Sequence, residues 1–339
     1  MNLKNVFKSL KYIASLLLAF GILYLLFKNQ DPQKLLLDIQ KVELKWVIFS
    51  MIFGGWAIVN RGLRWIVLID ALGYKSSKWN SIAAVSILYF TNLFIPRAGE
   101  ISRCTALNQV EKIPVDKLLG TIIIERVIDF VFLFILIILT TIFKFNDIYK
   151  FYLVIYSQPS DISNVNNLIL IISIISVFVL CFFYFNKLLR KSPLYDKILK
   201  FILGIKAGFN SIKKMRRKPA FWFHTFSIWI MYFLMTYICF FSMEETTHLT
   251  ASDGLFLLIL GGIGMIIPTP GGIGSYHAIV MIGLSVLGIG SIFYGNNENV
   301  SNPALLFPTI VHTAQTLVAI IMGLIGLLIL FISKKNVTL

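Results

Sequence analysis

The sequence predicts an all-α polytopic membrane protein, because its composition and its apolar runs both fall outside the range of soluble domains. Of its 339 residues 57% are hydrophobic and 14% are charged, and the mean hydropathy is +0.81. In soluble domains about a quarter of the residues are charged. Apolar runs long enough to cross a hydrocarbon core of about 30 Å recur along the chain. A membrane β-barrel would instead show short alternating segments, so we expect the spans to be helices.

Nine apolar segments are candidates for membrane helices, and we expect them to form a single domain over 1–339. They are, in order, 10–27, 45–70, 79–95, 115–143, 167–186, 221–243, 253–268, 274–291 and 304–332. The first follows a lysine-rich start and shows no small-residue cleavage site before Lys28. It is therefore predicted to be an uncleaved helix and not a removed signal peptide.

The distribution of positive charge predicts the orientation of these helices. The formal net charge is +15, and the stretch 187–218 holds eleven Lys or Arg residues against the single Asp196. By the positive-inside rule this loop and both lysine-bearing termini are cytoplasmic, in a bacterial inner membrane. The loop also has apolar residues at helical spacing, which fits an amphipathic helix on anionic lipid as an alternative to a purely topogenic role. Because the charge is concentrated in this loop, nucleic acid is not an expected partner.

Two segments are predicted to enter the membrane and return on the same side, since nine full crossings would separate the termini. The hairpin at 79–112 would enter from the cytoplasm and the one at 254–290 from outside, leaving about six full spans. The order of crossings is then an inverted-topology repeat with halves of about 1–145 and 166–335. "IPRAGEIS" and "IPTPGGIG" agree at four of eight positions. The expected hairpin breaks are at Pro96, Gly99, Pro268, Pro270, Gly271, Gly272 and Gly274.

Eight ionisable residues fall within or beside the predicted membrane segments. They are Arg61, Arg64, Arg97, Glu100, Arg103, Glu125, Arg126 and Asp129. At about 2.5–3.5 kcal/mol for each unpaired charge at the bilayer centre, they cannot all face lipid. Glu125 and Asp129 share one helix face and call for positive partners from another segment. Five positive and three negative charges leave an excess of +2, which suits one phosphate group held by arginine forks.

Each group of charges has a second interpretation. Arg61 and Arg64 either snorkel to the cytoplasmic interface or join the charged cluster. Glu125, Arg126 and Asp129 either form an ion-pair cluster that only stabilises helix packing or line a binding site. For Arg97, beside the first break, and for Glu100 and Arg103, headgroup binding is favoured.

The remaining reactive residues suggest little chemistry. His277 follows the second break and is either a proton-linked switch or simply hydrogen-bonded. The other histidines are scattered, so no metal is expected. The three cysteines are expected to be packing residues. No nucleotide-binding or hydrolase motif occurs in the sequence, so no cofactor is expected and catalysis is not favoured.

Three motifs together resemble a known family. "IPRAGEISR" from Ile95, "ERVIDF" from Glu125 and "PTPGGIGSYH" from Pro268 are similar to the lysylphosphatidylglycerol synthase transmembrane region, also called flippase-like or UPF0104-type. The resemblance covers about 10–332 and concerns the membrane module without the aminoacyl-transferase domain. It implies a lipid flippase whose polar core falls on Arg97, Glu100, Arg103, Glu125, Arg126 and Asp129. Family members often carry an acid where this sequence has His277.

The sequence therefore predicts a lipid translocase that moves a phospholipid or lipid-linked headgroup between leaflets through a groove lined by that polar core and His277. Expected partners are membrane lipids, either anionic or aminoacylated phospholipids, and a glycosyltransferase or aminoacyl-transferase. The alternative is an accessory or intramembrane transferase subunit that acts on a lipid-linked substrate. In that case Glu125 and Asp129 would serve as acid and base.

Overall fold

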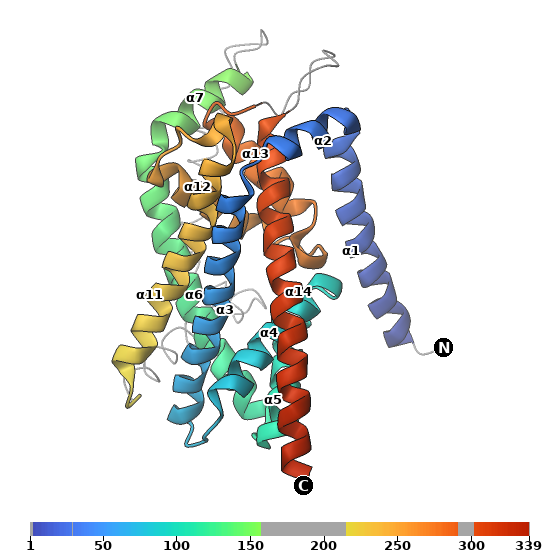
Figure 1. Cartoon of the computed structure of the whole chain (residues 1–339), viewed down its shortest axis with the longest axis vertical. Coiled ribbons are helices and arrows are strands. Elements are labelled where there is room, and N and C mark those ends of the chain that lie inside the picture. Colours follow the sequence, from blue (N-terminus) through green and yellow to red (C-terminus); the bar gives the residue numbers. More distant parts are fainter. Residues whose placement is uncertain (1–2, 29, 157–214, 291–301, 339) are drawn as a thin grey trace, which may run out of the picture.

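The computed structural model describes residues 3–28, 30–156, 215–290 and 302–338, and every regular element in these ranges is helical. The expected span at 167–186 and nearly all of the basic loop at 187–218 lie outside the described residues. Figure 1 shows an elongated bundle whose N-terminal and C-terminal ends both lie in its lower half.

The chain begins with three helices, α1 (Leu3–Phe27), α2 (Pro32–Lys41) and α3 (Leu44–Ala71). The sequence predicted the first and third but missed α2, which turns by 87° from the end of α1. The sequence carried a helix-start signal in Asp31 and Pro32. In the structure the Asp31 carboxylate accepts the backbone N–H of Gln33 at 2.8 Å, and Pro32 occupies the first turn. An acidic N-cap followed by proline favours a helix start.

The first predicted hairpin consists of α4 (Lys78–Phe94) and α5 (Gly99–Glu111). These helices have 17 and 13 residues, hence lengths of about 26 and 20 Å, shorter than a hydrocarbon core of about 30 Å. Between them Pro96 lacks a backbone N–H and Arg97 has a φ of 65°, so the helix cannot continue. Gly99 lies against the Leu88 carbonyl so closely that a Cβ would clash with it.

The second hairpin consists of α12 (Ala251–Gly264), the 3₁₀ turn η3 (Pro270–Gly272) and α13 (Ser275–Val286). Its limbs of 14 and 12 residues are about 21 and 18 Å long. Three glycines in the break, Gly271, Gly272 and Gly274, have positive φ, which glycine adopts without steric cost. The expected break residues therefore all lie at or beside an interruption of a helix.

The two breaks touch each other. The Arg97 guanidinium donates a hydrogen bond of 3.1 Å to the Ile266 carbonyl oxygen. Figure 1 shows the first hairpin in the lower half of the bundle and the second in the upper half. The hairpins thus approach from opposite ends of the long axis and meet at their tips.

The remaining helices surround these hairpins. They are α6 (Val115–Phe143), α7 (Phe145–Tyr156), α11 (Lys218–Tyr237) with its 3₁₀ extension η1 (Ile238–Ser242), η2 (Glu244–Thr246) and α14 (Pro303–Thr338). No helix was expected between the predicted segments 115–143 and 167–186, but α7 lies there. The Lys144 ammonium, at the end of α6, pairs with Asp147 at 3.3 Å and also with Asp253 of α12.

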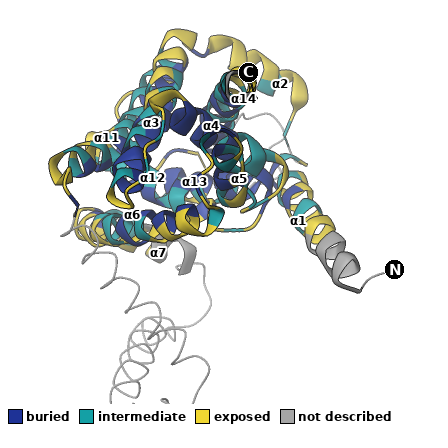
Figure 2. Cartoon of the chain, turned by 90° about the horizontal axis from the view of Figure 1, so that it is seen from below, coloured by how far each residue is buried: buried dark blue, intermediate teal, exposed yellow. Residues whose placement is uncertain are grey.

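The outer surface suits lipid. Within the described ranges three helices, Leu44–Ala71, Lys218–Ser242 and Pro303–Lys335, are long and apolar enough to cross a membrane, and the bent pair α1–α2 would make a fourth. Large apolar side chains are exposed, for example Phe143 at 68% and Phe331 at 71%. Figure 2 shows exposed residues around the perimeter and buried ones toward the centre. The chain is a multi-pass membrane protein; the number of crossings stays a prediction.

Candidate functional site

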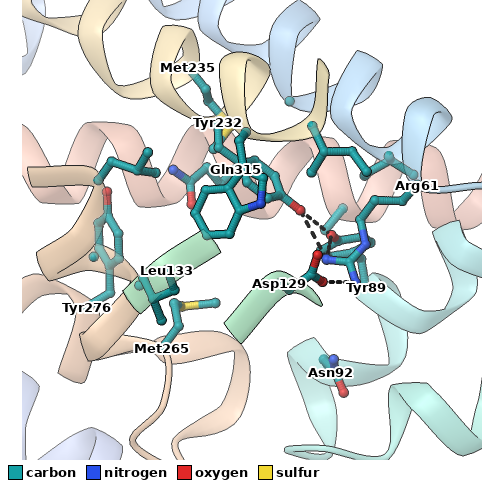
Figure 3. Close-up of a pocket in the computed structure, with 18 of the residues that line it drawn as sticks. Arg61, Tyr89, Asn92, Asp129, Leu133, Tyr232, Met235, Met265, Tyr276 and Gln315 are labelled. Carbon is teal, nitrogen blue, oxygen red and sulfur yellow. Dashed lines mark hydrogen bonds and ion pairs between the residues drawn. The ribbon is translucent and has the colours of Figure 1, made fainter. Parts of the chain in front are cut away.

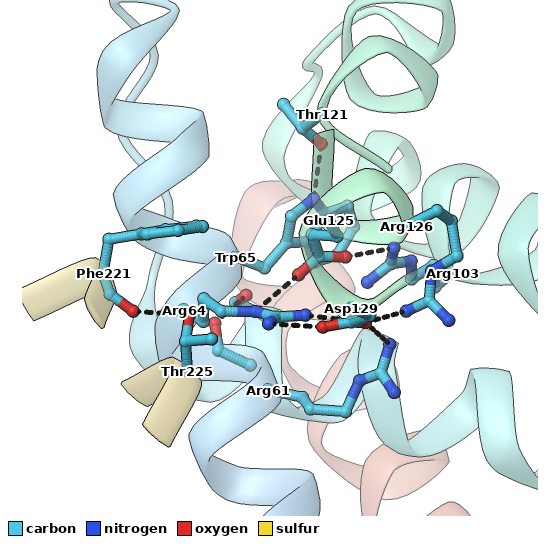
Figure 4. A network of polar contacts seen from close by, with 12 residues as sticks. Arg61, Arg64, Trp65, Arg103, Thr121, Glu125, Arg126, Asp129, Phe221 and Thr225 are labelled. Atoms are coloured by element: carbon cyan, nitrogen blue, oxygen red, sulfur yellow. Dashed lines mark hydrogen bonds and ion pairs between the residues drawn. The ribbon is translucent and has the colours of Figure 1, made fainter. Parts of the chain in front are cut away.

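Two arginines on α3 enter the interior of the bundle. Arg61 and Arg64 are one turn apart and therefore share a helix face. Between them Gly62 lies against Ile82 of α4, where a Cβ would come within 2.6 Å of the Ile82 Cα. This close approach of two backbones brings the arginines beside the first hairpin (Figure 4).

Arg64 is completely buried and holds two carboxylates of α6. Its Nη1 donates to Asp129 Oδ1 at 2.7 Å and its Nη2 to Asp129 Oδ2 at 3.1 Å, while its Nε lies 3.5 Å from Glu125 Oε1. Arg61 is 7% exposed, and its Nη2 lies 3.6 Å from Asp129 Oδ2. The snorkelling interpretation of these two residues is therefore wrong, because neither head group reaches the surface.

Arg103 of α5 supplies the second cation for Glu125. Its Nη2 donates to Glu125 Oε2 at 2.5 Å, its Nε lies 2.9 Å from Glu100 Oε2, and both Arg103 and Glu125 are fully buried. The guanidinium lies 4.6 Å from the ring centroid of Trp65, a cation–π contact. The predicted ion pairing of Glu125 with another segment is confirmed.

Arg126 of α6 contacts the same carboxylates but is itself partly exposed. Its Nη2 lies 3.1 Å from Asp129 Oδ2 and its Nε 3.5 Å from Glu100 Oε1, with 45% of its side chain exposed. The predicted contact between Arg126 and Asp129 is confirmed. We call Arg61, Arg64, Glu100, Arg103, Glu125, Arg126 and Asp129 the charged network.

The charged network carries an excess of one positive charge. It joins four guanidiniums to three carboxylates. Burying an ion costs several kcal/mol unless a partner compensates it. Ion pairing therefore explains how the bundle accommodates so many buried charges. One positive charge of the network has no negative counterpart.

Beside the charged network lies a cavity of about 840 Å³, lined by residues of α3, α4, α6, α11, α12, α13 and α14. At one end Arg61 Nη1 donates to the hydroxyl oxygens of Tyr89 at 3.0 Å and Tyr232 at 3.2 Å, which lie 2.6 Å from each other. Asp129 and Asn92 lie at the same end (Figure 3). We call this end the arginine end.

The opposite end of the cavity carries no Asp, Glu, Lys or Arg side chain. It includes Tyr276, His312 and Gln315, and the His312 Nε2 lies 2.9 Å from the Gly271 carbonyl oxygen. Between the ends the lining is largely apolar, with Leu133 and Met265 among its members (Figure 3). The cavity thus combines one charged end with a long apolar surface.

From the exposure of its lining residues we infer that the cavity opens between α6 and the tip of the second hairpin. Four apolar lining residues there are exposed, namely Ile123 at 59%, Phe130 at 46%, Met265 at 50% and Ile266 at 58%. Arg126 lies on the same side of α6 as Ile123 and Phe130, at spacings of three and four residues. We call this opening the lateral portal.

The structure does not bring Arg97 or His277 into the charged network. Arg97 is exposed and contacts Ile266 at the junction of the hairpins. The expected excess of two charges therefore needs correction to one. His277 is 6% exposed, and its ring centroid lies 4.8 Å from that of His312. Its role as a proton-linked switch stays a prediction.

Sequence reasoning missed the polar residues that line the cavity. Tyr89, Asn92, Tyr232 and Gln315 all come from helices that read as plain apolar spans. The i, i+3 spacing of Tyr89 and Asn92 could have indicated the cavity, because it places two hydrogen-bonding groups on one face of α4. Among the described residues no group of three His, Cys, Asp or Glu could hold a metal ion.

Comparison with known proteins identifies the family. The family described as the lysylphosphatidylglycerol synthase TM region matches residues 12–323. The chain belongs to this family. It is also 24% identical over 265 residues to the UPF0104 membrane protein MJ1595 of Methanocaldococcus jannaschii, a match that covers 72% of this chain and 76% of that protein. No solved structure matches the chain. This member of the lysylphosphatidylglycerol synthase TM family places its ERVIDF motif, through Glu125 and Asp129, at the centre of the charged network.

Proposed function

We propose that this protein is a lipid translocator that passes the headgroup of a phospholipid or lipid-linked molecule between leaflets. The observation that carries the proposal is that one cavity has both an arginine end and a lateral portal. A headgroup needs polar partners inside the bilayer, whereas its acyl chains need none. A cavity with a charged end and an apolar surface that opens sideways supplies both environments at once.

The charges at the arginine end suit a phosphate. Arginine engages phosphate oxygens with parallel hydrogen bonds, and such charge-assisted bonds are stronger than neutral ones. Arg126 is partly exposed and lines the cavity, and Arg61, which lies near the same oxygen of Asp129, also lines it. In this proposal these two residues replace Arg97 and Arg103 as the phosphate contacts, because Arg103 is fully buried by Glu100, Glu125 and Trp65.

The hairpin arrangement supports an inverted-topology repeat with halves of about 1–145 and 166–335. Two short hairpins that approach from opposite ends and touch at their breaks are what such a repeat would produce. In our proposal both termini are cytoplasmic, the membrane is a bacterial inner membrane, and rocking of one half against the other alternates access. Arg97 would then act at the junction of the halves, through its bond to the Ile266 carbonyl oxygen.

The transferase alternative receives less support from the geometry. Glu125 and Asp129 would have to exchange protons with a substrate, yet each already pairs with at least two guanidiniums. Glu125 is also 0% exposed, so it lies out of reach of a substrate in the cavity. An accessory role beside a glycosyltransferase or aminoacyl-transferase remains compatible with translocation.

Translocation can be tested with the purified protein in liposomes that contain a fluorescent phosphatidylglycerol, by measuring the exposure of the label to a membrane-impermeant quencher. Wild-type protein should speed movement well above empty liposomes, and Arg126→Gln should slow it at least about fivefold. Arg217→Gln is the matched control, since Arg217 is an exposed arginine paired with Asp70 away from the cavity. Equal rates with and without protein would refute translocation of this lipid, and a chemically altered lipid would support the transferase.

A further inference from the structure

Each carboxylate of the charged network is already ion-paired with at least two guanidiniums. Asp129 is the acidic residue that lines the cavity among the described residues, and it lies within 3.6 Å of Arg61, Arg64 and Arg126. Glu125 is 0% exposed and lies between Arg64 and Arg103. An ammonium group that entered the cavity would thus meet carboxylates whose charge is already neutralised.

At the cavity surface the guanidinium of Arg61 has donors without acceptors. Arg61 is more than nine-tenths buried and lines the cavity, and its Nε and Nη2 have no hydrogen-bond acceptor within the described part of the chain. Its Nη2 lies 3.6 Å from Asp129 Oδ2, which is beyond hydrogen-bond length. Buried donors without acceptors cost free energy. An incoming anion would relieve that cost, and a cation would not.

The rest of the cavity adds no negative charge. Its opposite end carries Tyr276, His312 and Gln315, and the surface between the ends is largely apolar. Hydroxyl and amide groups there suit a headgroup with hydroxyls, and the apolar lining suits a segment of acyl chain. Like charges brought together in a low dielectric repel strongly. The excess positive charge of the network therefore acts against any ligand of the same sign.

We infer that the cavity selects lipids whose phosphodiester headgroup is net anionic and discriminates against those whose headgroup carries an added aminoacyl cation. This inference rests on the proposed function and names its substrate class. It differs from what the family description alone would suggest, because every carboxylate of the charged network is already ion-paired with arginine. The geometry assigns the selection to Arg61 and Arg126 at the arginine end.

Phosphatidylglycerol and lysyl-phosphatidylglycerol form the decisive pair of probes, since they share phosphate, glycerol and acyl chains. The purified full-length protein is given an equimolar mixture of the two, and bound lipids are counted by native mass spectrometry. We expect phosphatidylglycerol to be preferred at least about tenfold. Equal occupancy, or a preference for the lysylated lipid, would overturn the inference. Inorganic phosphate and glycerol phosphate are added as competitors, and displacement of the lipid by either would assign the site to a soluble phosphate instead.

Variants separate selectivity from folding. Arg126→Gln removes the excess charge at a half-exposed position, so the preference should fall below about threefold while the elution volume and helical content stay unchanged. Arg217→Gln, on the exposed pair with Asp70, should keep the full preference. An Arg126→Gln protein that keeps the tenfold preference would contradict the assignment.

The same two lipids in liposomes distinguish this inference from the proposed function. If binding is selective but neither lipid moves, translocation fails and the charge selectivity stands. If both lipids move and bind equally, selectivity fails and translocation stands.

Discussion

Arg64 and Asp129 face each other as a bidentate pair across the interface of α3 and α6, with Nη1–Oδ1 at 2.7 Å and Nη2–Oδ2 at 3.1 Å. The same carboxylate also lies near Arg61 and Arg126 at the edge of the cavity. Asp129 therefore links the fully buried part of the charged network to the part that lines the cavity. A change at one side of Asp129 will alter both the packing of α3 on α6 and the electrostatics of the cavity.

Removal of Arg64 should be among the most destabilising single changes in the chain. Arg64→Leu would leave Asp129 and Glu125 without their shared buried cation, and breaking a buried pair on one side costs about 3–5 kcal/mol. Unfolding in mixed micelles of mild detergent and dodecyl sulfate measures this free energy. Arg217→Leu, which breaks an exposed pair with Asp70, should cost about 1 kcal/mol or less.

The double variant distinguishes pairing from packing. Arg64→Leu combined with Asp129→Leu removes both charges of the bidentate pair, so it should cost less than the sum of the single changes by at least about 1 kcal/mol. Strict additivity would show that the pair is not coupled in solution.

Gly99 should tolerate no side chain. A Cβ at this position would collide with the Leu88 carbonyl oxygen and lie within 2.7 Å of Asn92 Oδ1, which now accepts the Gly99 N–H at 2.8 Å. Gly99→Ala must therefore separate α5 from α4, and we expect a loss of about 2 kcal/mol or more, in the range of overpacked cores.

The matched control for Gly99 is another glycine in a helix. A Cβ added at Gly120 of α6 would have nothing within 4 Å of it, and alanine is the better helix former by about 0.5–1 kcal/mol. Gly120→Ala should accordingly be neutral or stabilising. A similar loss of stability in both variants would mean that the close approach at Gly99 is not what limits this site.

Lys112 offers a stabilising change. It ends α5 in the left-handed region with φ 56° and ψ 21°, while its backbone N–H bonds to the Asn108 carbonyl oxygen. Glycine adopts this conformation without the steric cost that other residues pay. Lys112→Gly should raise the free energy of unfolding by about 0.5–1 kcal/mol, because it relieves this backbone strain. Lys117→Gly, within the first turn of α6, should instead lower it.

The positions of the helices were predictable where a long apolar run alone marks a helix. The expected segments at 45–70 and 115–143 match α3 and α6 within one residue at each end, and both hairpin breaks lie where proline and glycine interrupt an apolar run. Helix α2 was missed because this short amphipathic helix has no apolar run long enough to cross a membrane. Its Asp31–Pro32 cap indicated where it begins.

The sequence predicted most residues of the charged network but not which of them pair with each other. Spacing placed Glu125 and Asp129 on one face, yet it could not show that Arg64 lies opposite them. An arginine side chain can be buried along its stem either when its guanidinium snorkels to the membrane surface or when it pairs with an internal carboxylate. Which of the two occurs depends on the helix that packs against α3. Arg97 shows the reverse error: its position beside a break suggested the network, whereas the fold turns it toward Ile266.

The last prediction concerns the cavity as a path for lipid. Gly262 of α12 lines the cavity, and a Cβ there would meet only Leu133 Cδ1, at 3.8 Å. Gly262→Phe should therefore place its ring in the cavity without disturbing the helix backbone, and should slow lipid movement in liposomes at least about fivefold. Gly55→Phe adds the same ring on α3, where nothing lies within 4 Å of the Cβ, and should leave the rate unchanged. If the Gly262→Phe protein folds and moves lipid at the wild-type rate, lipid does not pass through this cavity.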